Sequence, residues 1–120
     1  MTTQSTDAPQ AVQDCHDLIV WLIPQLDKFP RSRRFTLGER IESRLISVLE
    51  SLVEAAYSRD KRPLLRQANR QLAVARHLWR MAFELRAISS RVFEHGAGLV
   101  DSLGRQIGGW LKSQRPAETG

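Results

Sequence analysis

The stretch from residue 60 to 88 constrains the fold of this chain more than any other part of its sequence. Its residues form one long amphipathic helix when each is placed about 100° round the axis from the one before. Six basic side chains then fall within an arc of about 120°, namely Arg62, Arg66, Arg70, Arg76, His77 and Arg80. Apolar side chains such as Leu65, Leu72 and Trp79 fill most of the remaining circumference, so this helix needs a wide face buried against other elements.

The row of arginines is poorly explained by the stability of the helix itself. Between Arg59 and Arg86 the chain has eight Lys or Arg and two acids, a net charge of +6. Like charges four residues apart, as at Arg62 and Arg66, repel by about 0.2–0.5 kcal/mol per pair. The pattern favours a partner with phosphates or carboxylates, which a planar guanidinium group bonds at two points. A solvated polar face that uses arginine is the alternative interpretation.

The charge of the whole chain is concentrated in this one helix. The chain has 120 residues, 42% of them hydrophobic, and a formal net charge of +5, which together indicate one globular domain. Residues 1–30 carry a net −3, residues 31–58 and 87–120 each carry +1, and residues 59–86 carry +6. Local basicity of this kind is typical of a nucleic-acid surface or of docking to an acidic protein.

The sequence predicts a cytoplasmic protein without membrane association. Cys15 is the only cysteine, so an internal disulfide is impossible and a reducing compartment is expected. The N-terminal residues MTTQSTDAPQ lack the basic and apolar regions of a signal peptide. No stretch reaches the roughly 18 consecutive apolar residues of a membrane-spanning helix.

Helical periodicity recurs in three further segments, at about 10–28, 36–58 and 91–113. No strand pattern is present, and the connections are short. The fold class is therefore expected to be all-α, an antiparallel up-down-up-down four-helix bundle over residues 10–113. Disordered tails are expected at 1–9 and 114–120.

Several helix ends carry recognisable signals. Thr36 and Glu39 fit a capping box, with Thr36 as the N-cap of the second helix. Asp60 as N-cap, or Pro63 as first helical residue, can start the third helix, and the sequence leaves the choice open. The serine pair 89–90 can cap the fourth helix.

A second basic cluster, Arg31, Arg33 and Arg34, lies in the predicted connection between the first two helices. It is a candidate for nucleic-acid binding together with the arginines of the third helix. A solvated loop explains the same three residues equally well.

No catalytic constellation is recognisable in the sequence. The histidines, at positions 16, 77 and 95, are far apart and form no metal-binding motif such as HExxH or Glu-x-x-His. Cys15 lies on the apolar seam of its helix, which favours a core residue over a nucleophile. A hydrolase or nuclease based on carboxylates is disfavoured because no acids converge. We therefore expect no enzymatic activity and no cofactor.

Four short strings resemble a known family when taken in order. They are DLIVWLIP at 17–24, FPR at 29–31, RFTLGERI at 34–41 and IGGWLK at 107–112. Their order and spacing resemble the accessory variability determinant, Avd, of diversity-generating retroelements over about residues 12–112. That family lies within a wider group of small bacterial four-helix proteins related to those encoded in ribosomal RNA intervening sequences.

The resemblance implies a four-helix bundle that assembles as a basic, barrel-like pentamer. It also implies binding to the retroelement's reverse transcriptase and to RNA or DNA, in support of mutagenic copying of a template RNA into cDNA. The wide apolar arc of the third helix independently predicts a homo-oligomer, but not its number. Because aromatic residues are scarce on the basic arc, contacts to the nucleic-acid backbone without sequence readout are expected. The alternative function is a protein-interaction bundle whose basic helix binds an acidic partner and no nucleic acid.

Overall fold

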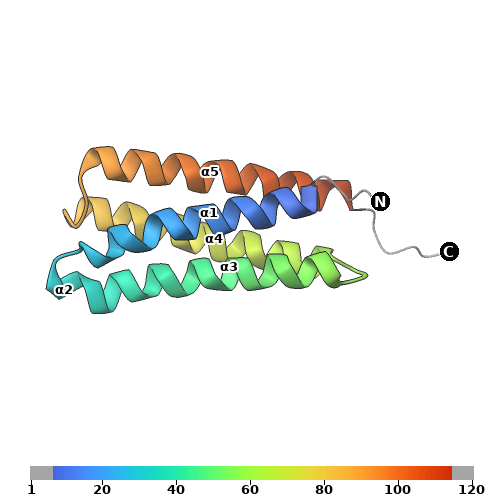
Figure 1. Ribbon diagram of the computed structural model, residues 1–120, viewed down its shortest axis with the longest axis horizontal. Coiled ribbons are helices and arrows are strands. Elements are labelled where there is room, and N and C mark those ends of the chain that lie inside the picture. The colour runs from blue at the N-terminus through green and yellow to red at the C-terminus, as the bar shows by residue number, and fades with distance from the viewer. Residues whose placement is uncertain (1–6, 115–120) are drawn as a thin grey trace.

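Four long helices lie side by side in an antiparallel bundle, as the computed structural model shows for residues 7–114 (Figure 1). They are α1 (Asp7–Asp27), α3 (Glu39–Tyr57), α4 (Arg62–Glu84) and α5 (Ser90–Ser113). The predicted all-α four-helix bundle is confirmed. α1 begins at Asp7 rather than near residue 10. The rest of the predicted N-terminal tail, residues 1–6, and most of the C-terminal tail, residues 115–120, lie outside the described residues.

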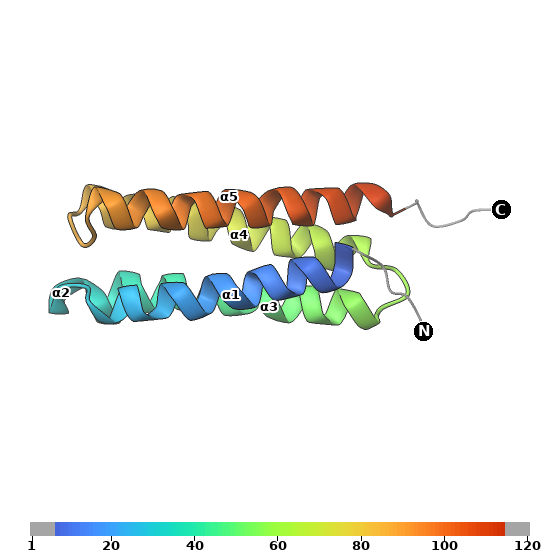
Figure 2. The same cartoon turned by 45° about the horizontal axis from the view of Figure 1, so that its top comes forward.

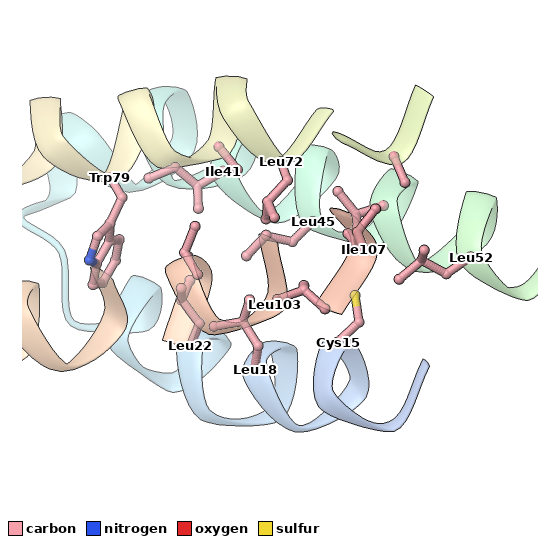
Figure 3. Packing of buried hydrophobic residues seen from close by; sticks show 14 of the residues in the cluster. Cys15, Leu18, Leu22, Ile41, Leu45, Leu52, Leu72, Trp79, Leu103 and Ile107 are labelled. Atoms are coloured by element: carbon pink, nitrogen blue, oxygen red, sulfur yellow. The ribbon is translucent and has the colours of Figure 1, made fainter. Parts of the chain in front are cut away.

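Each helix packs against two neighbours around one apolar core. α3 and α5 both contact α1 and α4, so α1 and α4 occupy opposite corners of the bundle (Figure 2). Leucine, isoleucine and tryptophan side chains from all four helices meet in the centre, among them Leu22, Ile41, Leu72, Trp79 and Ile107 (Figure 3). Their spacing of three or four residues along each helix is the reason that these segments form helices that bury one face. Within the described part of the chain, no helix has the length and apolar character needed to cross a membrane.

The predicted capping box at Thr36 and Glu39 is wrong. A turn of helix, α2 (Arg31–Arg33), begins directly after Pro30 and continues through a π-helix, η1 (Arg34–Gly38), into α3. The amides of Arg33 and Arg34 donate to the Pro30 carbonyl at 2.8 and 3.0 Å, so helical structure starts well before Thr36. The Thr36 hydroxyl then bonds back to the carbonyl of Arg33 at 3.4 Å, as threonines inside helices do.

The predicted cap of α5 is confirmed, whereas α4 starts at neither of the two predicted residues. α4 begins at Arg62, so Pro63 is its second residue rather than its first, and the N-cap position is Lys61 rather than Asp60. The Asp60 carboxylate nevertheless accepts from the amide of Arg62 at 3.3 Å, at the start of the helix. Ser89 caps α5 by accepting from the amide of Val92 at 3.2 Å.

The end of α4 differs from the prediction near residue 87. The helix ends at Glu84, and Arg86 adopts a left-handed backbone conformation with φ of 62°. The amide of Arg86 donates to the Phe83 carbonyl, and that of Ala87 to the Ala82 carbonyl, which is the hydrogen-bond pattern of a Schellman motif. This position usually holds glycine, which explains why sequence periodicity alone did not reveal the stop.

A close contact between α4 and α5 depends on Gly96. Trp79 of α4 is 1% exposed, and its indole Nε1 donates to the carbonyl of Phe93 at 3.0 Å. A Cβ atom at Gly96 would lie 2.7 Å from the indole ring. The missing side chain therefore allows the rigid indole to lie against the backbone of α5.

We expect Gly96→Ala to lower the free energy of unfolding by roughly 1–3 kcal/mol, because the buried indole cannot move aside. Gly98→Ala is the matched control on the same helix, since a Cβ at Gly98 meets nothing within 4 Å. The control should raise stability by up to about 1 kcal/mol, the difference in helix propensity. Urea unfolding followed by circular dichroism at one protein concentration measures both. Equal stabilities for the two variants would contradict the close contact.

Candidate nucleic-acid interface

The basic side chains of α4 lie on the side of the helix opposite its buried stripe. Arg66, Arg70, Arg76, His77 and Arg80 are exposed and Arg62 is half-buried; we call these six residues the basic face of α4. The buried stripe consists of Leu65, Ala68, Leu72, Ala75, Trp79 and Ala82. The structure therefore brings the six candidate residues of this helix to one surface.

Three arginines of the basic face are paired with acids. Arg76 Nε lies 3.0 Å from Asp101 of α5, and Arg80 Nε lies 3.1 Å from Glu84 one turn along α4. Both pairs are about half exposed, so each contributes only about 0–1 kcal/mol to stability.

Arg62 is the least accessible member of the basic face. Its Nε is buried without a hydrogen-bond partner, 3.7 Å from a carboxylate oxygen of Asp60. Arg66 and Arg70, by contrast, are exposed and form no ion pair within residues 7–114. The charge available to a partner is therefore greatest at Arg66 and Arg70.

The second basic cluster lies on α2 and η1 at the end of the bundle that also holds the α4–α5 turn (Figure 1). Arg31 and Arg34 are exposed and Arg33 is half-buried. Arg34 donates from Nη1 to the Asp27 carbonyl at 3.1 Å, and its guanidinium lies 4.9 Å from the centre of the Phe35 ring. Arg34 thus helps to hold the connection, whereas Arg31 points its charge to solvent.

A groove joins the second basic cluster to the C-terminal end of α4. Arg33, Phe35 and Arg40 line one side of it, and Met81 and Leu85 of α4 line the other. The groove therefore brings arginines of the connection and of α3 beside the apolar side chains of α4, and no member of the basic face lines it.

A crevice of about 260 Å³ lies between α4 and α5, and we call it the α4–α5 crevice. Its lining consists of Ala73, Arg76, His77, Trp79, Arg80, Phe93, Ala97, Val100 and Asp101. Three candidate residues of the basic face thus share one cavity with aromatic and apolar side chains. The sequence did not single out Phe93, Ala97 and Asp101, although their spacing of four residues places them on one face of a helix.

Cys15 is a core residue. Its side chain is fully buried, and desolvation raises the pKa of the thiol to about 12. A neutral buried thiol packs as a small apolar group and is a poor nucleophile. Among residues 7–114, no three His, Cys, Asp or Glu side chains come together in a way that could hold a metal ion.

Comparison with known protein families identifies the chain. A family model described as bAvd-like matches residues 11–114. The chain belongs to the bAvd-like family. The match covers α3, α4 and α5 completely and nearly all of α1, and it confirms the resemblance to Avd. Membership of the bAvd-like family implies an accessory protein of a diversity-generating retroelement. A comparison with curated proteins gives no match.

We expect native Cys15 to react with a thiol reagent at pH 8 at least about a hundredfold more slowly than a free thiol, because burial suppresses the thiolate. Unfolding in urea should restore the ordinary rate. Absorbance of the released chromophore measures both rates, with glutathione as the control thiol. Rapid reaction of the folded protein would contradict the burial of Cys15 between α1 and the rest of the bundle.

Proposed function

We propose that this bAvd-like protein is a non-catalytic accessory protein of a diversity-generating retroelement. In this role it binds the reverse transcriptase, and it binds template RNA or cDNA through the basic face of α4. The observation that carries the proposal is the net charge of +6 over residues 59–86, the segment that contains α4, together with the exposure of Arg66 and Arg70, which form no ion pair in the described structure. Such a surface loses stability through repulsion unless a polyanion neutralises it.

The arrangement of the basic face suits a phosphate backbone. Arg66 and Arg70, like Arg76 and Arg80, are one helical turn apart, a rise of about 6 Å. Successive phosphates of one extended strand can therefore meet successive guanidinium groups. Arg31, Arg33 and Arg34 lie at the same end of the bundle as the C-terminus of α4, across the groove lined by Arg33 and Met81, and provide further cations for the strand (Figure 1). Contacts of this kind position a strand without reading its sequence.

Two complementary faces support the further proposal that the protein is a homo-oligomer. Exposed and half-buried acids surround apolar side chains on the acidic face of α3, which consists of Glu39, Glu42, Ile46, Glu50, Val53 and Glu54. The apolar edge of α4 consists of the partly exposed Val74, Met81 and Leu85. The basic face lies beside that edge on the same helix. Apolar side chains of this size, exposed by more than a third, are expected to gain from burial against another copy.

Charge complementarity directs the acidic face of one copy toward α4 of the next. A two-fold dimer or a closed ring both satisfy this pairing, because each copy carries both faces. The number five comes from the resemblance to Avd. A ring would repeat the basic face several times and strengthen binding to a long strand through multivalency.

We expect Arg66→Ala, Arg70→Ala and Arg80→Ala together to weaken binding of unrelated RNA or DNA sequences about equally. The slope of log affinity against log salt should fall by up to about 2 for single strands, because each lost phosphate contact removes about 0.7. Fluorescence anisotropy over a salt series measures this, with circular dichroism as a check on folding. The matched control is Arg91→Ala, Arg105→Ala and Lys112→Ala, which removes the same charge from exposed positions of α5.

The control triple variant should keep a slope close to that of the wild type. If the two triple variants bind alike, net charge alone attracts the nucleic acid and the basic face of α4 has no special part. If the first variant folds and binds with unchanged affinity and slope, the interpretation of α4 as a protein-docking surface replaces the proposal.

We expect light scattering to give a mass of about five times the 13.7 kDa of one chain at micromolar concentration. Ile46→Arg should lower that mass, because it places a cation in the acidic face where α4 of another copy is expected to dock. Val20→Arg is the control, since Val20 is exposed on α1 and belongs to neither face. A wild-type protein that stays monomeric would count decisively against assembly.

A further inference from the structure

We infer that the α4–α5 crevice takes one unpaired base of a single-stranded nucleic acid whose backbone follows the basic face of α4. The inference rests on the proposed binding of nucleic acid and adds to it a preference for single strands. It is carried by the chemistry of the crevice, which combines cationic groups at its mouth with an aromatic and apolar lining.

The two kinds of lining residue match the two parts of a nucleotide. Arg76, His77 and Arg80 are exposed and supply donors for a phosphate. Phe93 and Ala97, which are half-buried, and the exposed Ala73 provide the accessible apolar lining, whereas Trp79 and Val100 are each 1% exposed and back it from the core. The volume of about 260 Å³ falls just below the range of roughly 300–1,000 Å³ typical of pockets for drug-sized ligands, so a small planar group suits it.

The aromatic lining is already rigid before anything binds. Trp79 is held by its hydrogen bond to the Phe93 carbonyl and by the close approach at Gly96. The Phe93 ring stacks on Phe83, with 4.6 Å between ring centres and 15° between planes. A base that enters the crevice therefore orders few side chains, which lowers the entropic cost of binding.

Asp101 prepares the mouth of the crevice by orienting Arg76. Its carboxylate accepts from Arg76 Nε at 3.0 Å and fixes the guanidinium across the α4–α5 boundary. Within the described residues, the terminal amino groups of Arg76 have no hydrogen-bond acceptor, so they are free to bind a phosphate. Asp101 is thus a positioning residue for this contact.

A base fits these observations better than an acidic peptide or a duplex. A peptide carboxylate would use the cations at the mouth but leave the aromatic lining without a partner. A duplex keeps its bases stacked inside and presents only phosphates to α4. An unpaired base stacks on aromatic side chains whatever its identity, while Arg66 and Arg70 continue the phosphate contacts along the helix. The sequence predicted contacts to the nucleic-acid backbone alone because aromatic residues are scarce on the basic arc of α4. The aromatic side chain that can stack on a base, Phe93, comes from the neighbouring helix α5.

The test fills the crevice without changing any charge. Ala97→Phe adds an aromatic side chain from α5, and Ala73→Phe adds one from an exposed position of α4, so a folding defect in the first variant leaves the second available. Gly109→Phe is the matched control, because it is exposed on α5 and a Cβ there meets nothing within 4 Å. The probes are an oligoadenylate and an abasic strand of the same length, each titrated by fluorescence anisotropy at several salt concentrations.

We expect the wild type and Gly109→Phe to bind the oligoadenylate roughly tenfold more tightly than the abasic strand, the effect of one base–aromatic stack. Both crevice-filling variants should lose that preference, bind the abasic strand as the wild type does, and keep the same salt slope. If folded Ala73→Phe retains the full preference, the crevice holds no base and the inference is overturned, while backbone binding stands.

Failure of the proposed function itself gives a different result. A wild-type protein that binds neither strand at low salt removes nucleic-acid binding and the base site with it. Polyglutamate is the competitor that tests the acidic-peptide alternative. If polyglutamate displaces the oligoadenylate from the wild type, and if the crevice-filling variants lose affinity for both ligands to the same extent, the crevice binds an acidic peptide instead.

Discussion

The contact between Trp79 and Gly96 determines how α4 and α5 meet. A rigid indole lies against helix backbone because Gly96 has no side chain, and its one polar atom is satisfied by the carbonyl of Phe93. Since a buried indole N–H without a partner would cost about 1–3 kcal/mol, this bond fixes the rotation of the ring as well as its depth. The same contact brings Phe93 of α5 and the arginines Arg76 and Arg80 of α4 to one crevice.

Opposite charges are separated between two neighbouring helices rather than paired across them. α3 carries four exposed or half-exposed acids and α4 carries five arginines, yet within residues 7–114 no ion pair joins the two helices. Their polar contact is instead that of Arg44 with Gln71, at 2.8 Å. The bundle is therefore stabilised by its apolar core, and its charges point outward. A charge pattern of this kind contributes to association with other molecules more than to folding.

The fold was predictable because helical periodicity depends on many residues at once. One misinterpreted side chain changes neither the buried face of a helix nor the number of helices. The bundle therefore follows from the hydrophobic pattern even where a helix end is predicted at the wrong residue. The ends are decided by single competing interactions. Pro30 starts helical structure early enough to place Thr36 inside it, and Arg86 ends α4 in a left-handed conformation without the glycine that usually marks such a stop. The spacing of apolar residues shows neither the early helix start after Pro30 nor the helix stop at Arg86.

The candidate site was predictable only as far as it lies on one helix. The angular position of each arginine on α4 follows from its residue number, so the basic face was expected correctly as a surface. The partners of those arginines depend instead on how two helices align. Asp101 meets Arg76, and Phe93 lines the same crevice as Arg80, only at one axial offset between α4 and α5. That offset is determined by the single place where an indole fits against a glycine. In the sequence Gly96 is one of several glycines in the last helix, and glycines there indicate only a weak helix. Its role becomes visible only when Trp79 is packed against it.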